Sequence, residues 1–417
     1  MRIRLLRFVI SALASAALFS GCAGGGSSVS QSAGAVPSAV QRGIVPNGQA
    51  EGGRQAHSGQ RRTLSEPSCS ATSLGIGAFV GGAGGNGGAD DNPNVANGQF
   101  AFVGAGSGNN ACDGWSAIAG GYDNAVSGSG EDGFIGAGEF NGVTGSDTDS
   151  AVVAGNGNQV SSAESAIVGG AGNTVSNEYG FIGGGNTNTL SGEYGVLGGG
   201  NTNTVSGSAA VIGGGQGSYA EGAYATVPGG YDNNAAGELS FAAGFKSYAR
   251  YAGSFVWSDY TSGATLLEST GVNQFLARAT GGFTLWTNAS NSVGATLAPG
   301  SGTWASASDR NLKTDVARID DAAVLDKVAQ LPISRWSYKS ERGVRHVGPM
   351  AQDFYAAFGV GEDDKHITSI DEDGVALAAI KALHAENAQL RRDLVAERAH
   401  DRRVDAELSR IADALRR

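Results

Sequence analysis

The middle of this sequence has no positive charge. Between Arg62 and Lys246 there is not one Lys or Arg, whereas 16 Asp and Glu residues fall there. A surface that follows a nucleic-acid backbone needs clustered Lys and Arg, so we expect no nucleic-acid partner. Histidine is also missing between Arg62 and Ala307, so this region has no dense cluster of His, Asp and Glu. We therefore expect no metal, no cofactor and no enzymatic activity in this part of the chain.

Glycine is in excess instead. The chain has 69 Gly among 417 residues, but only 5 of them follow residue 307. There is no G-X-Y period, which excludes collagen. The last 110 residues carry 18 Lys and Arg with 20 Asp and Glu, an ordinary mixture. This contrast predicts at least two unlike modules joined near residue 300.

The N-terminus has the features of an export signal. Residues 1–7 are basic, and the apolar run Phe8–Phe19 is shorter than the roughly 20 residues of a membrane-spanning helix. The run ends in Phe19-Ser20-Gly21-Cys22, which resembles a bacterial lipobox. The resemblance implies that Cys22 is lipidated and becomes the new N-terminus of an outer-membrane, cell-surface lipoprotein. An ordinary secretory signal is the alternative.

The segment after Cys22 has no apolar period. Residues 23–72 are rich in Gly, Ser, Gln and Ala, which predicts a disordered tether. Cys69 and Cys112 would lie in an exported chain, where a disulfide is chemically allowed. The sequence leaves open whether these two cysteines pair or remain free thiols.

A repeat of about 15 residues fills the middle of the chain. One apolar position recurs and is followed two residues later by Gly or Ala, six residues later usually by Asn, and eight residues later often by a second apolar residue. The first apolar position is held by Val80, Val103, Ile118, Ile135, Val153, Ile167, Ile182, Leu197, Ile212, Val227 and Ala242. The Asn position is held by Asn86, Asn109, Asn124, Asn141, Asn173, Asn188, Asn203 and Asn233.

This repeat predicts a mainly β solenoid of about eleven coils. Each coil would contain two short strands and two turns, with one side chain pointing inward from each strand. Gly supplies the positive φ angles of tight turns, and stacked Asn side chains can hydrogen-bond along the axis. A coil cannot bury its own apolar face, so coils must stack. The core is thin and its neighbours are small, which leaves flat apolar walls and predicts an oligomer.

Three other interpretations of the coils are weaker. Gly81–Gly88 is similar to calcium-binding β-rolls, but most repeats lack the Asp that such rolls need. Thr187-Asn188-Thr189 and Thr202-Asn203-Thr204 are similar to ice-binding arrays, yet only two neighbouring coils carry that motif. The recurring acidic residues are expected to be solvated rather than bridged by cations. They are Glu178, Glu193 and Glu238.

The coils resemble the head repeats of YadA-type trimeric autotransporter adhesins over about 80–258. The closest similarity lies in Ala225-Thr226-Val227-Pro228-Gly229-Gly230 and Ser240-Phe241-Ala242-Ala243-Gly244. The resemblance implies a left-handed parallel β-roll of three chains around one axis. It also implies an adhesin-like surface that binds an unidentified ligand, such as a host protein or a glycan.

The C-terminal part carries a second set of motifs. Ser308-Asp309-Arg310-Asn311-Leu312-Lys313 marks an abrupt change in composition, and Arg345-His346-Val347-Gly348-Pro349-Met350-Ala351-Gln352-Asp353 follows. In this order they resemble the intramolecular chaperone domain of endosialidases and phage tail proteins, over 308–417. That domain trimerises, guides folding of the upstream β-structure and then cuts itself off before its first Ser.

The resemblance assigns the site residues. It makes Ser308 the nucleophile, Lys313 the base and Ala307–Ser308 the scissile bond of a single-turnover Ser–Lys peptidase. Asp309, His346, Gly348 and Gln352 match the family motif, and we interpret His346 as a structural hydrogen-bonding residue.

The residue chemistry agrees with this assignment. A Ser hydroxyl is a weak nucleophile without a base, and a Lys with its ordinary pKa of about 10.4 must be buried to act as one. Leu312 and an assembled trimer would supply that burial. Ser308 and Lys313 are five residues apart, which is not one helical face. Either a bend in the chain or a neighbouring subunit must therefore bring them together.

A helix is expected from about Gly374 to the end, with a heptad seam that predicts a trimerising coiled coil. Asn387 would fix its register, whereas Glu397 and Asp401 interrupt it; packing on its own domain is the alternative. The seam residues are Ile380, Leu383, Asn387, Leu390, Leu394, Glu397, Asp401, Val404, Leu408, Ile411 and Leu415.

The sequence therefore predicts an anchored, trimeric β-solenoid passenger assembled by a self-cleaving α+β chaperone. The alternative is a prophage-derived tail-fibre or tailspike-type protein, secreted or part of a phage particle. The predicted segments are a lipoprotein signal (1–22), a tether (23–72), head repeats (73–258), a β connector (259–307), a chaperone and peptidase domain (308–373) and a coiled-coil helix (374–417).

Overall fold

The computed structural model describes residues 74–82, 93–145, 149–261 and 263–416. The predicted signal and tether, with Cys22 and Cys69, lie outside these residues. Within the described ranges, no helix is both long enough and apolar enough to cross a bilayer.

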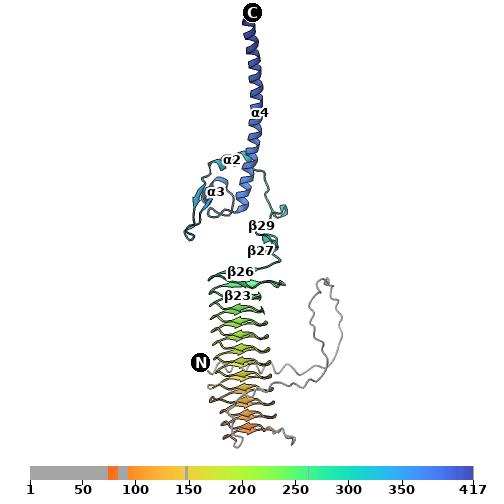
Figure 1. Ribbon diagram of the computed structural model, residues 1–417, viewed down its shortest axis with the longest axis vertical. Coiled ribbons are helices and arrows are strands. Elements are labelled where there is room, and N and C mark those ends of the chain that lie inside the picture. Colours follow the sequence, from red (N-terminus) through yellow and green to blue (C-terminus); the bar gives the residue numbers. More distant parts are fainter. Residues whose placement is uncertain (1–73, 83–92, 146–148, 262, 417) are drawn as a thin grey trace, which may run out of the picture. The chain divides into compact units, whose positions relative to one another are not determined.

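Most of the described chain forms a stack of coils with two parallel sheets (Figure 1). In each sheet, strands pair with the equivalent strands of the neighbouring coils, so Ile182 lies opposite Ile167 on one side and Leu197 on the other. This arrangement confirms the predicted mainly β parallel solenoid of about eleven coils. The stack continues past residue 258, because β26 pairs in parallel with β24.

The first sheet contains β1 (Phe79–Val80), β3 (Phe102–Val103), β5 (Ala117–Ile118), β7 (Phe134–Ile135), β9 (Ala151–Val152), β11 (Ala166–Ile167), β13 (Phe181–Ile182), β15 (Val196–Leu197), β17 (Val211–Ile212), β19 (Thr226–Val227), β20 (Gly230–Tyr231), β22 (Phe241–Phe245), β24 (Phe255–Ser258) and β26 (Phe275–Arg278). The second contains β2 (Val95–Ala96), β4 (Asn110–Ala111), β6 (Ala125–Val126), β8 (Gly142–Val143), β10 (Gln159–Val160), β12 (Thr174–Val175), β14 (Thr189–Leu190), β16 (Thr204–Val205), β18 (Tyr219–Ala220), β21 (Asn234–Ala235), β23 (Ser247–Ala249) and β25 (Leu267–Glu268).

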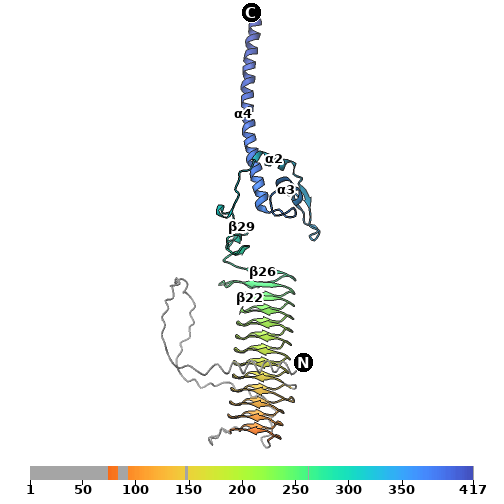
Figure 2. The same cartoon turned by 180° about the vertical axis from the view of Figure 1, so that it is seen from behind.

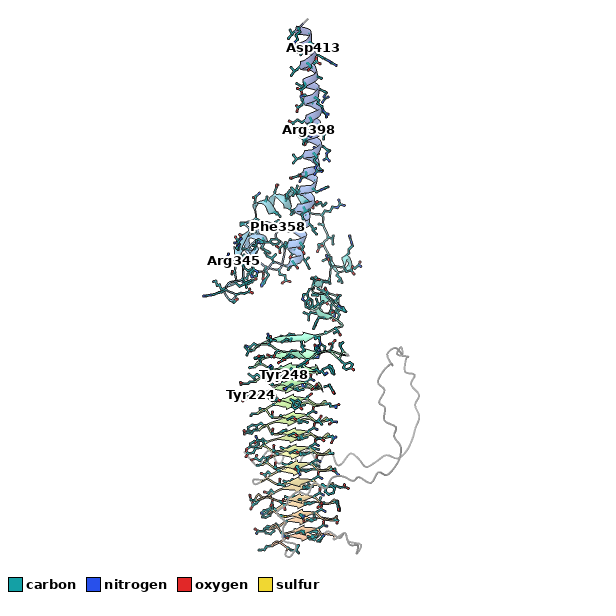
Figure 3. The ribbon with its side chains drawn as sticks, viewed as in Figure 1. Tyr224, Tyr248, Arg345, Phe358, Arg398 and Asp413 are labelled. Atoms are coloured by element: carbon teal, nitrogen blue, oxygen red, sulfur yellow. The ribbon has the colours of Figure 1, made fainter. Side chains whose placement is uncertain are left out.

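The core consists of two rows of side chains, one from each sheet. In a typical coil Ile182 and Leu190 are fully buried, and each such side chain contributes about 1.5–3 kcal/mol on burial. Side chains at the turns point away from the stack, as Tyr224 does in Figure 3. The solenoid is therefore held by one thin apolar column that every coil shares with its neighbours.

One predicted core position was wrong. Val152, not Val153, is fully buried and pairs with Ile135 and Ile167. Both residues are apolar valines, so the pattern around them did not separate the inward from the outward side chain. The correct register is consistent with the rest of the repeat, because Asn158 then lies six residues after the inward valine.

The recurring asparagines form a buried ladder along the axis. The backbone N–H and the Nδ2 of Asn188 both donate to Oδ1 of Asn173, at 3.0 Å each. The same Nδ2 also donates to the carbonyls of Gly184 and Gly200, at 3.0 Å each. Asn188 Oδ1 in turn accepts from the Asn203 backbone N–H at 3.0 Å. The buried amide is thus fully hydrogen-bonded, and it ties each coil to the next.

The ladder differs from the prediction at one end and in the middle. Asn86 lies outside the described residues, and Asn94 occupies the ladder position of the first coil, where Asn109 Nδ2 donates to its Oδ1 at 3.0 Å. Asn158 belongs to the ladder as well. Ser218 replaces Asn at one position: its backbone N–H donates to Asn203 Oδ1 at 2.9 Å, and its Oγ accepts from the Asn233 backbone N–H at 3.3 Å.

Glycine residues beside the ladder allow neighbouring coils to lie close together. Gly185 has a φ of +92°, and a Cβ there would lie 2.2 Å from the carbonyl oxygen of Gly200 in the next coil. Any larger residue would push the two coils apart as well as strain the backbone.

Smaller elements follow the solenoid. Strands β27 (Phe283–Trp286), β28 (Gly294–Leu297) and β29 (Trp304–Ser306) form an antiparallel sheet, and β30 (Ser334–Trp336) pairs with β31 (His346–Gly348). The helices are the 3-10 turn η1 (Arg310–Leu312), α2 (Asp321–Gln330), α3 (Ala351–Phe358) and α4 (Ser369–Leu415).

Helix α4 begins five residues before the predicted start. Thr368 caps it, since its Oγ1 accepts from the Asp371 backbone N–H at 3.2 Å, and Gly374 lies inside the helix. The two opposite views show α2 lying against α4 (Figures 1 and 2). The residues of α4 that are buried are Ala378, Ala379 and Ala382.

The ladder makes a stability prediction. Replacing Asn188 with Ala should lower the free energy of unfolding of the solenoid by about 3 kcal/mol. Each buried polar group that loses its hydrogen-bond partner costs about 1–3 kcal/mol. Ser218→Asn restores a ladder residue and should leave stability unchanged or raised. Unfolding curves of both variants test this, and an Asn188→Ala protein as stable as the parent would contradict it.

Candidate functional site

The two residues predicted to form a catalytic pair lie in contact. Lys313 Nζ donates a hydrogen bond to Ser308 Oγ at 2.7 Å. Both come from the same chain. Of the two possibilities that the spacing left open, a bend or a neighbouring subunit, the single chain contains the bend.

A single capped turn produces this bend. Asp309 precedes η1, and its Oδ1 accepts from the Asn311 backbone N–H at 2.9 Å and from Asn311 Nδ2 at 3.1 Å. The Leu312 N–H donates to the Asp309 carbonyl at 3.1 Å, and the Lys313 N–H to the Arg310 carbonyl at 3.2 Å. The turn brings the Lys313 side chain within hydrogen-bonding distance of Ser308.

The other side of the predicted scissile bond is also held. Strand β29 ends at Ser306, and the Ala307 N–H donates to the Gly294 carbonyl on β28 at 3.1 Å. The Ala307–Ser308 peptide thus lies between a sheet on its N-terminal side and the capped turn on its C-terminal side. Sequence reasoning missed both Gly294 and Asn311; the Asp-x-Asn spacing was the available signal for Asn311.

The pair is open to solvent in the single chain. Ser308, Lys313 and the intervening Leu312 are all exposed. A lysine amine becomes a base near neutral pH only when burial or neighbouring charge disfavours its protonated form. The single chain supplies the geometry of the pair but not this burial.

The other motif residues lie on different elements. His346 and Gly348 are on β31 and Gln352 is on α3. Among the described residues, no hydrogen bond or ion pair joins any of them to Ser308 or Lys313. Asp309 is the one motif residue that takes part in the turn.

His346 belongs to an aromatic cluster on the β30–β31 hairpin. Its ring stacks on Trp336 with centroids 4.6 Å apart and meets Tyr338 at 5.6 Å. Its Nε2 lies 3.5 Å from Glu341 Oε2. Among the described residues, the buried Nε2 has no hydrogen-bond partner, so the contacts of His346 on the hairpin are mainly aromatic and the single chain shows no hydrogen bond for it.

Two further positions bear on the predicted sites. Cys112 is disulfide-bonded, and its partner lies outside the described residues. In the part of the chain that the structure describes, no three His, Cys, Asp or Glu side chains are arranged to hold a metal ion.

The heptad seam of α4 is largely exposed within the part of the chain that the structure describes. Ile380 is 63% exposed, Leu383 49% and Leu390 66%, whereas the helix packs on its own domain through small alanines. Of the apolar residues in 308–416, only Phe354, Ala378, Ala379 and Ala382 are buried. This module therefore has almost no apolar core of its own.

Comparison with known protein families gives a match in the C-terminal module. Residues 308–359 match the family model Peptidase_S74, described as chaperone of endosialidase. The match begins at Ser308 and ends one residue after α3. No curated protein matches the chain. The similarity of the coils to YadA-type head repeats stays a prediction.

Proposed function

We propose that this chain is a trimeric β-solenoid passenger whose C-terminal module assembles it and then cuts itself off between Ala307 and Ser308. The observation that carries the proposal is the 2.7 Å contact between Lys313 Nζ and Ser308 Oγ, at the first residue of the endosialidase-chaperone match. The passenger fits a tail-fibre-like or adhesin-like role, since a long solenoid presents a repeated surface and needs no catalytic site.

The cleavage proceeds in two steps. Neutral Lys313 takes the proton of the Ser308 hydroxyl, and Oγ attacks the carbonyl carbon of Ala307. The Ala307–Ser308 C–N bond breaks, the acyl group moves to Oγ, and the freed amine of Ser308 is protonated. Water then hydrolyses the ester, which leaves a carboxylate on Ala307 and a free Ser308 N-terminus.

Exposed apolar surface supports the proposed trimer. The C-terminal module leaves its seam uncovered, and a water-exposed stripe of this kind is stable only when another helix covers it. Assembly would also bury Leu312 and Lys313, and burial favours the neutral amine that the reaction requires. Trimerisation would in this way switch on the peptidase.

The solenoid also presents an apolar surface, on its first sheet. The residue before each inward side chain is apolar in every coil except at Thr226, and the residue after it is small or apolar. Examples are Phe102, Phe134, Phe181 and Phe241, whereas the second sheet presents hydroxyl side chains such as Thr174 and Ser176 at the corresponding positions. We assign the first sheet to the contact between chains.

A chaperone is useful because the coils are nearly interchangeable. Three chains that associate one coil out of register lose few local contacts, and parallel pairing of distant segments is slow and prone to aggregation. A C-terminal coiled coil would align the chains before the coils close. Its removal afterwards leaves a passenger whose persistence depends on slow unfolding.

The proposal has two versions, which differ in where the protein is located. The lipobox-like sequence at Cys22 favours an exported lipoprotein on the outer membrane, displaying the solenoid to a host protein or glycan. The chaperone match favours equally a prophage-derived tail-fibre protein. The two versions share the same assembly and the same cut.

The cut predicts two fragments, which end at Ala307 and begin at Ser308. Ser308→Ala removes the nucleophile and Lys313→Ala removes the base, so each should give one full-length band that still trimerises. N-terminal sequencing of the small fragment checks the assignment. A first residue other than Ser308 would overturn it.

The seam predicts a selective loss of assembly. Leu390→Glu puts a charge into the proposed trimer interface and should reduce both the trimer and the cleaved fraction at least tenfold. Val395→Glu is the matched control, because Val395 is 64% exposed and lies off the seam. Light scattering and gels report the two quantities, and equal effects of both variants would argue against the seam.

Anchoring predicts labelling of Cys22. Cells fed a radioactive fatty acid should incorporate label into the wild-type chain and not into Cys22→Ser. If wild-type protein stays unlabelled while cleavage proceeds, the tail-fibre version is favoured and the lipoprotein version fails.

A further inference from the structure

The turn that joins Ser308 to Lys313 depends on one side chain. η1 has only three residues, and a turn this short has little stability of its own. Asp309 Oδ1 accepts both hydrogen bonds of the cap, from the backbone N–H and from the Nδ2 of Asn311. Without this acceptor, the turn keeps only two backbone hydrogen bonds, at 3.1 and 3.2 Å.

Asp309 does not contact the reacting atoms. Among the described residues, its side chain bonds only to Asn311, while the Ser308 hydroxyl bonds to Lys313. A role for Asp309 in the reaction must therefore act through the position of Lys313.

We propose that Asp309 is a positioning residue: as an N-cap, it folds the chain so that Lys313 reaches Ser308 within the same subunit. The proposal rests on the self-cleavage proposed above and adds two claims. The first is that the cap geometry matters and the charge of the carboxylate does not. The second is that the pair works in cis.

Substitutions at Asp309 can distinguish the effect of the cap geometry from the effect of the carboxylate charge. Asn and Ser are about as good N-caps as Asp and carry no charge, whereas Ala provides no acceptor. Glu keeps the charge but moves its oxygens one methylene further out, so the cap is lost. We expect Asn and Ser to cut at close to the parent rate, and Ala and Glu to be slower by roughly 2- to 30-fold, the range by which loss of an N-cap shifts a folding equilibrium.

The experiment follows cleavage of the full-length chain by pulse–chase in cell-free synthesis. Trimer formation is measured in parallel, so that slow cutting is separated from failed assembly. If Asp309→Ala does not assemble, the Asn and Glu variants decide, because both are close to Asp in size. Fast cutting by Glu with slow cutting by Asn would overturn the cap and assign the role to the charge. A parent rate in the Ala variant would show that the Asp309 side chain has no role in the reaction.

Mixed trimers test the second claim. Chains with Ser308→Ala and chains with Lys313→Ala are synthesised together. If the pair acts in cis, no chain is cut; if Lys313 acts on a neighbouring subunit, the Lys313→Ala chains are cut by their partners. If the wild-type chain is not cut at all, the proposed function itself is rejected. This outcome differs from one in which the wild type is cut but the cap claim or the cis claim fails.

Discussion

The solenoid depends on the hydrogen bonds that tie one coil to the next. A coil of about 15 residues is too short to bury its own side chains, so its two inward residues are buried only by the coils on either side. The asparagine ladder adds a polar constraint to this apolar column. Asn188 bonds to the coil before it and the coil after it, and a fully satisfied buried amide tolerates no shift in register.

For the proposed trimer, this dependence gives a reason for a separate assembly module. The ladder specifies which coil follows which within one chain, yet it carries no information about how three chains align. Repeating coils offer many nearly equivalent alignments, and the first sheet presents an apolar residue in every coil except at Thr226. A seam that begins near Ile380 and lies outside the repeat supplies a unique alignment, which is the role we assign to α4.

The C-terminal module, unlike the solenoid, leaves most of its apolar side chains exposed. Its helices bury Phe354 and three alanines and leave most other apolar side chains in water. The same lack of a core leaves Ser308 and Lys313 exposed in a single chain. The pair already has its geometry in the single chain, and under the proposal it would become buried only on assembly. In this scheme, cleavage reports that folding is complete.

The sequence by itself determined the repeat, the parallel solenoid and most of its inward residues, because a regular period and a turn chemistry of Gly and Asn are local signals. It also pointed to Ser308 and Lys313 through motif resemblance, and the match that begins at Ser308 agrees with that family. Local signals failed where two interpretations were equivalent, as for the adjacent valines 152 and 153, and at the first coil, where Asn94 holds the ladder position. The tertiary structure alone decided the rest. The bond from Ala307 to Gly294 depends on the pairing of β28 with β29, and the exposure of the α4 seam depends on α2 covering the alanine face instead. Neither follows from spacing along the chain, because each is a contact between segments whose mutual placement is set by folding.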